Sequence, residues 1–339
     1  MSELTALPRG SVVLVTGANG YIGSQVTNTL LELGYRVRGT VRADKPWLTE
    51  LFKNKYGEGV YEQAIVPHLD DQEALKQAMT GVAGVASIAS DVSLSDDPDA
   101  VIPWVVKATE TILAVAAKQP SIKRVVLTSS AYAASIRVPD QKGVVVDEST
   151  FNEPAIKAAW DPNTPKEGKA AFVYAASKAE GERAAWKWVE ENKPGYVFNT
   201  ILPNFTTGEI LHPQIHGSTM GFASGLLKGE AAGLQVFMPQ RFVDVGDVAR
   251  LHAIALLAEP VKSQRIWGSA KAYTTSDFID VFHELRPDNK LIPEKPADEG
   301  QDLTELPPAA KAEALLQKYF GQKSWTPFKE SVEAGIHGL

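Results

Sequence analysis

Two side chains with complementary acid–base chemistry, Tyr174 and Lys178, stand four residues apart in a segment with a helical pattern. Residues at this spacing lie side by side on one face of a helix. A phenol has a pKa of about 10, so it is a poor acid at neutral pH unless a nearby cation stabilises its phenolate. The pair can therefore protonate a carbonyl oxygen as hydride arrives, or deprotonate an alcohol in reverse. Ser130, just after an apolar run, can hydrogen-bond the same oxygen.

The spacing alone does not identify a catalytic pair, because the chain contains it twice. The second instance is Tyr319 and Lys323, near the C-terminal end. We favour Tyr174 because its helix follows a strand that ends in two serines, in a chain whose first strand leads into a glycine-rich turn. Tyr319 has no such neighbours, and we expect it to be a packed aromatic side chain.

Short apolar strands alternate with helical patterns through the first part of the chain, which is typical of a parallel α/β sheet. Strands are expected at residues 11–16, 36–41, 61–66, 83–89, 124–128 and 197–202. Helices are expected at residues 24–34, 73–79, 101–118 and 172–192, and a long loop at 139–169. This pattern predicts a Rossmann-type, doubly wound parallel sheet over residues 1–203, which carries the Ser/Tyr/Lys site.

The pattern becomes less regular after residue 203. Helices are expected at residues 219–227, 245–257, 276–284 and 309–319, and a strand near 264–267 is expected to return to the main sheet. We therefore expect residues 204–339 to form a smaller, mainly helical substrate lobe. Such a lobe would cover the carboxyl ends of the strands, where ligands bind in open α/β sheets.

The first strand leads directly into three glycines spaced G-x-x-G-x-x-G, which are Gly17, Gly20 and Gly23. Glycines at a strand-to-helix turn let the backbone approach a pyrophosphate at the helix N-terminus. A glycine triple by itself also marks ordinary turns. Its place between a strand and a helix favours dinucleotide binding.

The residues after the second strand favour NADP over NAD. An acid at this position accepts the ribose hydroxyls of NAD, whereas an arginine accommodates the 2′-phosphate of NADP. Here the strand ends in Arg42, with Lys45 close behind. Asp44 is the one acid in this loop, and a small shift could bring it to the ribose. We expect NADPH/NADP as the cofactor because a guanidinium is well matched to a phosphate.

Composition excludes several classes of function. The 339 residues carry a formal net charge of −7 and no cysteine, and 44% of them are hydrophobic. These values indicate a soluble globular protein without disulfides, with neither nucleic acid nor a membrane as its partner. No signal peptide and no uncharged apolar run long enough to span a bilayer are present, so a cytoplasmic monomer or homodimer is expected.

The histidines do not predict a metal site. His212 and His216 are four apart, but Pro213 between them argues against a helical metal-binding pair. His252 lies in an apolar helical segment and is expected to be packed. Asp244 is expected to cap or flank the start of that helix.

Several motifs together resemble the extended short-chain dehydrogenase/reductases. They are T-G-A-N-G-Y-I-G at residues 16–23, L-T-S-S at 127–130, Y-A-A-S-K at 174–178 and L-P-N-F at 202–205. Within that family the chain is similar to the branch of dihydroflavonol reductase, cinnamoyl-CoA reductase and the fungal NADPH-dependent ketone and aldehyde reductases. The fungal aldehyde reductase II type looks nearest. The resemblance extends over nearly the whole chain.

The resemblance implies a role for each matching residue. Ser130, Tyr174 and Lys178 would form a catalytic triad in which the tyrosine donates the proton and the lysine also holds the nicotinamide ribose. The glycine turn would bind the pyrophosphate, and Arg42 and Lys45 the 2′-phosphate. Cofactor contacts are implied for Gly17, Gly20, Tyr21, Ile22, Gly23, Arg42, Lys45, His68, Leu69, Ala89, Ser90, Thr128, Tyr174, Lys178 and Pro203.

Two positions depart from the family pattern. An Asp after the third strand often holds the adenine, but His68 and Leu69 stand there, followed by Asp70 and Asp71. Backbone groups would then have to hold the adenine. In the fourth strand the family often has a His where this chain has Ser87, a difference expected to have little effect on function.

The resemblance implies an NADPH-dependent carbonyl reductase, an NADP-dependent oxidoreductase of the alcohol dehydrogenase type. It would reduce aryl ketones, β-keto esters or aldehydes, because an apolar slot lined by aromatic side chains is expected beside the triad. Candidate lining residues are Val92, Tyr132, Phe205, Phe222 and Met238. Two alternatives remain open: a nucleotide-sugar epimerase or dehydratase of the same fold, and a non-catalytic NADP-binding sensor.

Overall fold

A seven-stranded parallel sheet forms the centre of the protein. In this computed structural model, residues 3–235, 237 and 239–338 are described. The strand order is β3-β2-β1-β4-β5-β6-β9. The first three strands follow one another toward one edge of the sheet, and β4 then begins a second series that runs from β1 toward the other edge. The strands are β1 (Val12–Val15), β2 (Arg36–Val41), β3 (Tyr61–Ile65), β4 (Gly84–Ser87), β5 (Arg124–Thr128), β6 (Val197–Pro203) and β9 (Arg265–Gly268). This topology is Rossmann-like, and it confirms the predicted fold class.

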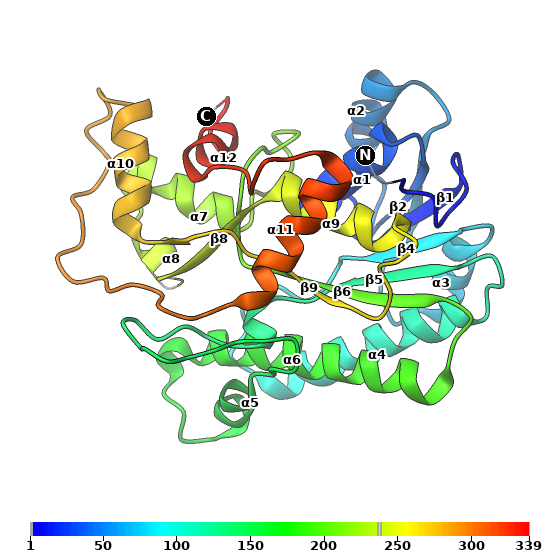
Figure 1. The fold of residues 1–339 in the computed structure, drawn as a ribbon, viewed down its shortest axis with the longest axis horizontal. Coiled ribbons are helices and arrows are strands. Elements are labelled where there is room, and N and C mark those ends of the chain that lie inside the picture. The colour runs from blue at the N-terminus through cyan, green and yellow to red at the C-terminus, as the bar shows by residue number, and fades with distance from the viewer. Residues whose placement is uncertain (1–2, 236, 238, 339) are drawn as a thin grey trace.

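Helices cover both faces of the sheet, above and below it in the view of Figure 1. One face carries α1 (Tyr21–Glu32), α2 (Pro46–Tyr56), α9 (Val245–Leu257) and α11 (Pro307–Phe320). The other carries α3 (Gln72–Met79), α4 (Pro98–Ala117) and α6 (Lys166–Asn192). Because both faces are buried, central strands such as β1 and β5 have continuous apolar runs, whereas the edge strand β3 contains polar and exposed residues.

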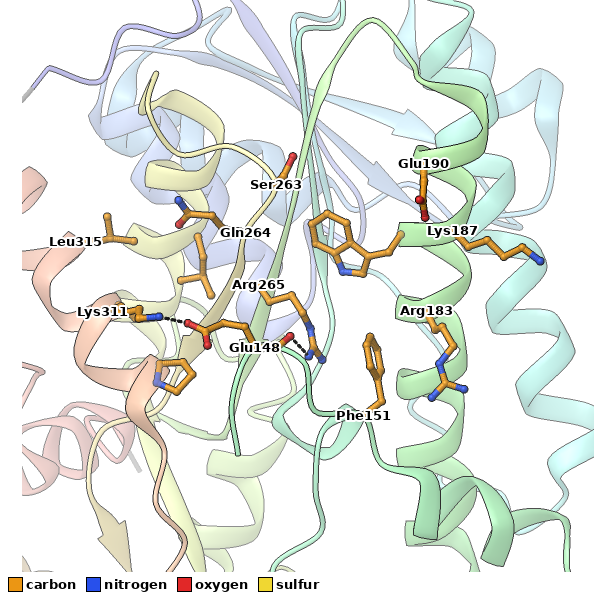
Figure 2. Close-up of a pocket in the computed structure, with 14 residues that line it drawn as sticks. Glu148, Phe151, Arg183, Lys187, Glu190, Ser263, Gln264, Arg265, Lys311 and Leu315 are labelled. Carbon is orange, nitrogen blue, oxygen red and sulfur yellow. Dashed lines mark hydrogen bonds and ion pairs between the residues drawn. The ribbon is translucent and has the colours of Figure 1, made fainter. Parts of the chain in front are cut away.

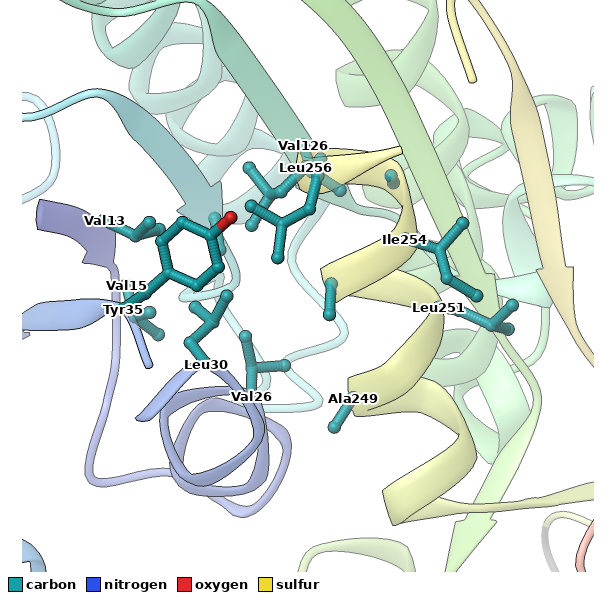
Figure 3. Close-up of a cluster of buried hydrophobic side chains, with 14 of the residues drawn as sticks. Val13, Val15, Val26, Leu30, Tyr35, Val126, Ala249, Leu251, Ile254 and Leu256 are labelled. Atoms are coloured by element: carbon teal, nitrogen blue, oxygen red, sulfur yellow. The ribbon is translucent and has the colours of Figure 1, made fainter. Parts of the chain in front are cut away.

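The core between the sheet and α1 and α9 is made almost entirely of aliphatic side chains. Figure 3 shows Val26 and Leu30 of α1 facing Val13 and Val15 of β1, with Leu256 of α9 beside them. All five are fully buried. Burying apolar area of this kind is the main force that holds the helices against the sheet.

The lobe lies beside the carboxyl ends of the strands, at the left of Figure 1. It contains a three-stranded sheet of β7 (Phe205–Thr207), β8 (Gln240–Asp244) and β10 (Ala272–Tyr273), in the order β10-β8-β7. Its helices are α7 (Thr219–Gly225), α8 (Ala232–Gln235), α10 (Thr275–Leu285) and α12 (Phe328–Gly335). Its core is aromatic, with close ring contacts among Phe205, Phe242, Tyr273, Phe278 and Phe328.

Several sequence-based expectations about the elements are wrong. The segment predicted as a loop at 139–169 contains α5 (Glu153–Trp160), and α6 begins at Lys166 with a kink at Gly168, whose φ is 86°. The short strands β7, β8 and β10 and the helices α2 and α12 were not predicted. The three strands and α12 have two to eight residues, too few for a clear periodicity, because tertiary packing rather than local pattern stabilises them. The helix α2 has 11 residues, but only Leu48 and Phe52 are buried, so its apolar pattern is weak.

The helix α4 is long and apolar enough to cross a membrane by length and composition alone. In the structure α4 packs along α6, and 56% of its apolar stretch is buried inside the protein. Its charged residues include Asp99 and Lys107. The burial identifies α4 as a core helix of this fold.

Candidate active site

Ser130 lies at the carboxyl end of β5, where the sheet gives way to the short helix η1 (Ala131–Ala133). Its hydroxyl oxygen accepts a hydrogen bond from the backbone N–H of Tyr132 at 3.2 Å, so the serine caps η1. This bond holds the side chain in a fixed direction at the end of the strand. The ring of Tyr132 in turn contacts the ring of Tyr174 edge-on, at a centroid distance of 6.2 Å.

Tyr174 and Lys178 lie on one face of α6, with the lysine Nζ 5.8 Å from the centre of the tyrosine ring. Burial raises the pKa of Tyr174, and a hydrogen bond with Ser130 partly offsets that effect. Burial also lowers the pKa of Lys178 to about 8, although Asp91 and Glu182 act in the opposite direction. The structure therefore brings together the three residues that the sequence predicted.

A buried carboxylate that sequence reasoning missed links the elements that carry the three candidate residues. Glu182, one turn after Lys178, accepts hydrogen bonds from Ser129 at 2.8 Å and from Thr200 at 2.7 Å. Arg265 on β9 donates two more, at 2.8 Å and 3.0 Å. These contacts link α6 to β5, β6 and β9. The only signal in the sequence is the spacing of four residues from Lys178.

The glycine turn packs closely against itself and against the end of β4, so that side chains would not fit there. A Cβ on Gly23 would lie 2.1 Å from the carbonyl oxygen of Gly17. Gly17 itself has a φ of 66°, and a Cβ there would lie 3.0 Å from Ala89. The hydroxyl of Thr16 accepts the backbone N–H groups of Ile88 and Ala89 at 2.8 Å and 2.9 Å, which fixes the end of β4 beside the turn.

Gly20 caps the N-terminus of α1, so free backbone N–H groups at this end can face a phosphate. The side chain of Tyr21 is directed elsewhere: its hydroxyl donates to the carbonyl of Gly208 in the lobe at 2.7 Å. Ile22 packs against two of the hydrophobic clusters. Any pyrophosphate contact of these two residues would therefore come from their backbone.

Arg42 is exposed just after β2, where a 2′-phosphate of the adenosine ribose would lie in this fold. Lys45 is half-buried and caps α2, and its backbone is hydrogen-bonded to Gln63. His68 is exposed and Leu69 is half-buried after β3. The two acids that follow have other roles, since Asp70 pairs with Lys107 at 2.8 Å and Asp71 caps α3.

Ala89, Ser90, Thr128 and Pro203 all lie at the carboxyl edge of the sheet, at or beyond the ends of β4, β5 and β6. The Thr128 hydroxyl lies 2.7 Å from Nε2 of His252, so it is engaged with α9. His252 is fully buried, and burial lowers its pKa to about 4, which agrees with the expected packed role. The expected cap of α9 is also confirmed, because Asp244 accepts two of its first N–H groups.

The substrate candidates are in different environments. Tyr132 contacts Tyr174, whereas Phe205 is buried in the aromatic core of the lobe and Phe222 packs against Phe237. Val92 is exposed on the loop after β4, and Met238 lies outside the described residues. The same loop holds an exposed residue that sequence reasoning missed, Leu94, in a small pocket shared with Tyr174.

A cavity of about 670 Å³ lies between α6 and α11 (Figure 2), and none of the catalytic or glycine-turn residues lines it. Its cations already have acidic partners, because Arg265 pairs with Glu182 and Lys311 pairs with Glu148. This charge balance does not favour an anionic ligand. Among the described residues no group of three or more His, Asp or Glu side chains could hold a metal ion.

Comparison with known proteins gives consistent matches over most of the chain. The model of the NAD dependent epimerase/dehydratase family matches residues 13–267. The chain is 42% identical over 332 residues to ketoreductase nvfG of Aspergillus novofumigatus, covering 97% of both chains. It is 39% identical over 331 residues to aldehyde reductase 2 of Sporidiobolus salmonicolor, covering 96% of this chain and 95% of the relative. The structure of Gre2 from Candida albicans in complex with NADPH is similar with a TM-score of 0.80 at 25% identity, covering 96% of this chain and 98% of Gre2.

Proposed function

The chain belongs to the NAD-dependent epimerase/dehydratase family, and we propose that within it the protein is an NADPH-dependent carbonyl reductase. The resemblance to extended short-chain reductases found in the sequence is confirmed by the family match and by relatives named as ketoreductase and aldehyde reductase. The observation that carries the proposal is the arrangement of Ser130, Tyr174 and Lys178 at the carboxyl edge of the sheet, beside the glycine turn.

Each of the three residues has a distinct part in the reaction. NADPH, when bound, supplies the hydride that reduces the carbonyl carbon. Tyr174 donates its phenolic proton to the carbonyl oxygen, and Ser130 holds that oxygen by a hydrogen bond. Lys178 favours the phenolate that remains, because a cation beside a phenolate lowers the pKa of the phenol. The low pKa of Lys178, about 8, means that the lysine can change its protonation state near neutral pH.

The residues around the turn are proposed to hold the cofactor. The backbone at Gly17, Gly20 and Gly23 would face the pyrophosphate, and Arg42 would bind the 2′-phosphate. The adenine would lie near His68 and Leu69 and rely on backbone groups, since Asp70 and Asp71 have other partners. The substrates proposed are aryl ketones, aldehydes and β-keto esters. A cytoplasmic location, the domain boundary at residue 203 and a monomeric or dimeric state stay predictions.

The direct test follows the loss of reduced-nicotinamide absorbance with an aryl ketone, an aromatic aldehyde and a β-keto ester, each with NADPH and with NADH. Rapid consumption of NADPH with any of them supports the reductase. If neither cofactor is consumed and NAD co-purifies with the protein, a sugar epimerase is favoured instead. NADPH that binds without being consumed by any carbonyl would favour a sensor.

Arg42→Ala tests the cofactor assignment. One charge-assisted phosphate contact is lost, so the Michaelis constant for NADPH should rise on the order of tenfold while that for NADH stays unchanged. Arg36→Ala is the matched control, because Arg36 is exposed at the opposite end of the same strand. Equal effects of Arg42→Ala on both cofactors would remove Arg42 as the phosphate-binding residue.

A further inference from the structure

Buried polar atoms without a hydrogen-bond partner are concentrated at one place in the protein. Eight such side-chain atoms occur among the described residues, and five of them belong to Arg137, Asp302, Arg241 and Tyr273. We call these four residues the lobe cluster. Native proteins satisfy nearly all buried polar groups, so a concentration of this kind requires an explanation.

The lobe cluster joins four segments that are far apart in the sequence. Arg137 follows η1, and its Nε lies 3.3 Å from Oδ2 of Asp302, with side-chain exposures of 3% and 1%. Arg241 lies on β8, and its terminal nitrogens donate to the carbonyls of Ala270 and Thr304. Tyr273 lies on the adjacent strand β10. The atoms that have no hydrogen-bond partner are both terminal nitrogens of Arg137, Nε of Arg241, the Tyr273 hydroxyl and Oδ2 of Asp302, which has only the ion pair with Arg137.

The charges of the lobe cluster do not cancel. Two guanidinium groups, of the buried Arg137 and the half-buried Arg241, face one buried carboxylate, which leaves one net positive charge. Burial lowers the pKa of Arg137, and the nearby Arg241 acts in the same direction, whereas Asp302 opposes both. A buried cation without full compensation is unfavourable, so folding alone gives no reason to keep it.

Tyr132 connects the lobe cluster to the catalytic tyrosine. Its ring meets the ring of Tyr174 edge-on, and its hydroxyl interacts with the side chain of Gln240. Gln240 is the residue directly opposite Tyr273 in the β8–β10 pair. Arg137 is also close enough to act on the ionisation of Tyr132. A substrate whose carbonyl lies at Tyr174 could therefore extend past Tyr132 to these groups.

We propose that the lobe cluster binds the carboxylate of a keto acid substrate, with Arg137 as the principal ligand and Arg241 as a further donor. The proposal rests on the proposed carbonyl reductase function. Both terminal nitrogens of a guanidinium match the two oxygens of a carboxylate in one plane. A carboxylate also accepts several hydrogen bonds and donates none, and all but one of the unpartnered atoms are donors.

The chemistry of the lobe cluster distinguishes between anions. One net positive charge matches a singly charged carboxylate, whereas the two negative charges of a phosphate dianion would exceed it. Because the ring of Tyr132 lies between Tyr174 and Arg137, the carbonyl and the carboxylate of the substrate must be separated by a spacer. A short 2-keto acid should therefore not benefit from the lobe cluster.

The test compares aryl keto acids of increasing spacer length, starting from 4-oxo-4-phenylbutanoate, with their methyl esters and with alkyl phenones of equal length. In the wild-type enzyme, kcat/KM for the best keto acid should exceed that for its matched phenone on the order of ten- to a hundredfold. The gain should appear in KM, because the carboxylate lies away from the reacting atoms.

Arg137→Met together with Asp302→Asn removes both charges, so that no carboxylate is left buried alone. This double variant should lose the keto acid preference, and Arg137→Lys should restore part of it. Arg124→Met is the control: Arg124 is also a buried arginine, but its terminal nitrogens have backbone partners. It should keep the wild-type ratio of keto acid to phenone.

A binding measurement separates this proposal from the reductase assignment. Titration of the NADP-saturated protein with the same keto acids by calorimetry should show binding in the wild type that weakens at least about tenfold in the double variant. This result would support the site even if no carbonyl were reduced. The proposal is overturned if neither rate nor binding favours the carboxylate over the phenone, as expected if water alone satisfies these atoms. It is also overturned if the preference survives in the double variant.

Discussion

The two sides of the active site differ in how their buried polar groups are satisfied. On the side of the sheet, Glu182 accepts hydrogen bonds from Ser129, Thr200 and Arg265, and the Thr16 hydroxyl accepts two backbone N–H groups. On the side of the lobe, Arg137 and Tyr273 have buried donors without partners among the described residues. We call the hydrogen bonds around Glu182 the finished network, because its polar atoms have partners within the protein. The buried donors of Arg137 and Tyr273 belong to the unfinished network, because they have no such partners among the described residues.

This difference reflects what each side has to do. A network whose hydrogen bonds are complete within the protein holds Ser130 and α6 in place before any ligand arrives, which is the preorganisation that catalysis requires. Donors that lack partners gain most when a ligand supplies acceptors, because burying them unpaired is unfavourable. We infer that the sheet side fixes the chemistry and that the lobe side selects the substrate.

The largest effect is expected for Tyr174, the proposed proton donor. Tyr174→Phe removes the proton donor but little volume, so kcat should fall on the order of 10²- to 10⁴-fold while NADPH still binds. Steady-state kinetics and a fluorescence titration with NADPH measure the two quantities. Tyr319→Phe, in the second Tyr-x-x-x-Lys segment, should leave both near wild type. Near-normal turnover of Tyr174→Phe would exclude Tyr174 as the donor.

The finished network should be essential for stability. Glu182→Gln leaves Arg265 buried without its charge partner, and loss of one partner of a buried pair destabilises a protein by about 3–5 kcal/mol. Urea unfolding measures this free energy. Glu259→Gln breaks the exposed pair with Lys262 and should change it by less than about 1 kcal/mol. Similar effects of the two variants would show that the network does not hold α6 to the sheet.

The buried lysine should make stability depend on pH. The pKa of Lys178 is about 8 in the folded protein and 10.5 for a lysine without such interactions. Between these pH values the unfolded chain therefore binds one more proton at this residue than the folded protein does. The free energy of unfolding should therefore rise with pH from about 8 to 10.5, by about 3 kcal/mol for this group. The difference between wild type and Lys178→Met, measured without cofactor, reports it. Lys187→Met, an exposed lysine of the same helix, should show no such trend, and a flat difference for Lys178→Met would contradict the low pKa.

The smallest effect is expected in the unfinished network. Tyr273→Phe removes a buried hydroxyl that has no partner among the described residues, so the free energy of unfolding should stay within about 1 kcal/mol or rise. Thr200→Val removes a hydroxyl that donates to Glu182 and should lower it by about 1–3 kcal/mol. Thermal and urea unfolding of the two variants give the comparison. A large loss in Tyr273→Phe would mean that its hydroxyl is already satisfied.

The sequence predicted the elements whose signals are local. The strand, glycine turn and helix at residues 12–32 and the pair of Tyr174 and Lys178 all follow from neighbours within a few residues, as does the cap at Asp244. Their periodicity and turn chemistry are strong enough to be read without a tertiary context. The same local logic failed for β7, β8 and β10, which are two to five residues long.

What the sequence alone determined is therefore the parallel α/β sheet, the glycine turn and the shared helix face of Tyr174 and Lys178, because spacing along one helix or strand fixes which residues share a face. The catalytic role of these two residues and of Ser130 stays a prediction. The tertiary structure decided the rest. Glu182 and Arg265 are 83 residues apart. Arg137 and Asp302 lie in distant segments that meet through the pairing of Val145 with Glu305 and through hydrogen bonds between Asp140 and Gln301. No local pattern encodes such contacts, since they form only when the sheet and the lobe pack together and exclude water from the charges between them.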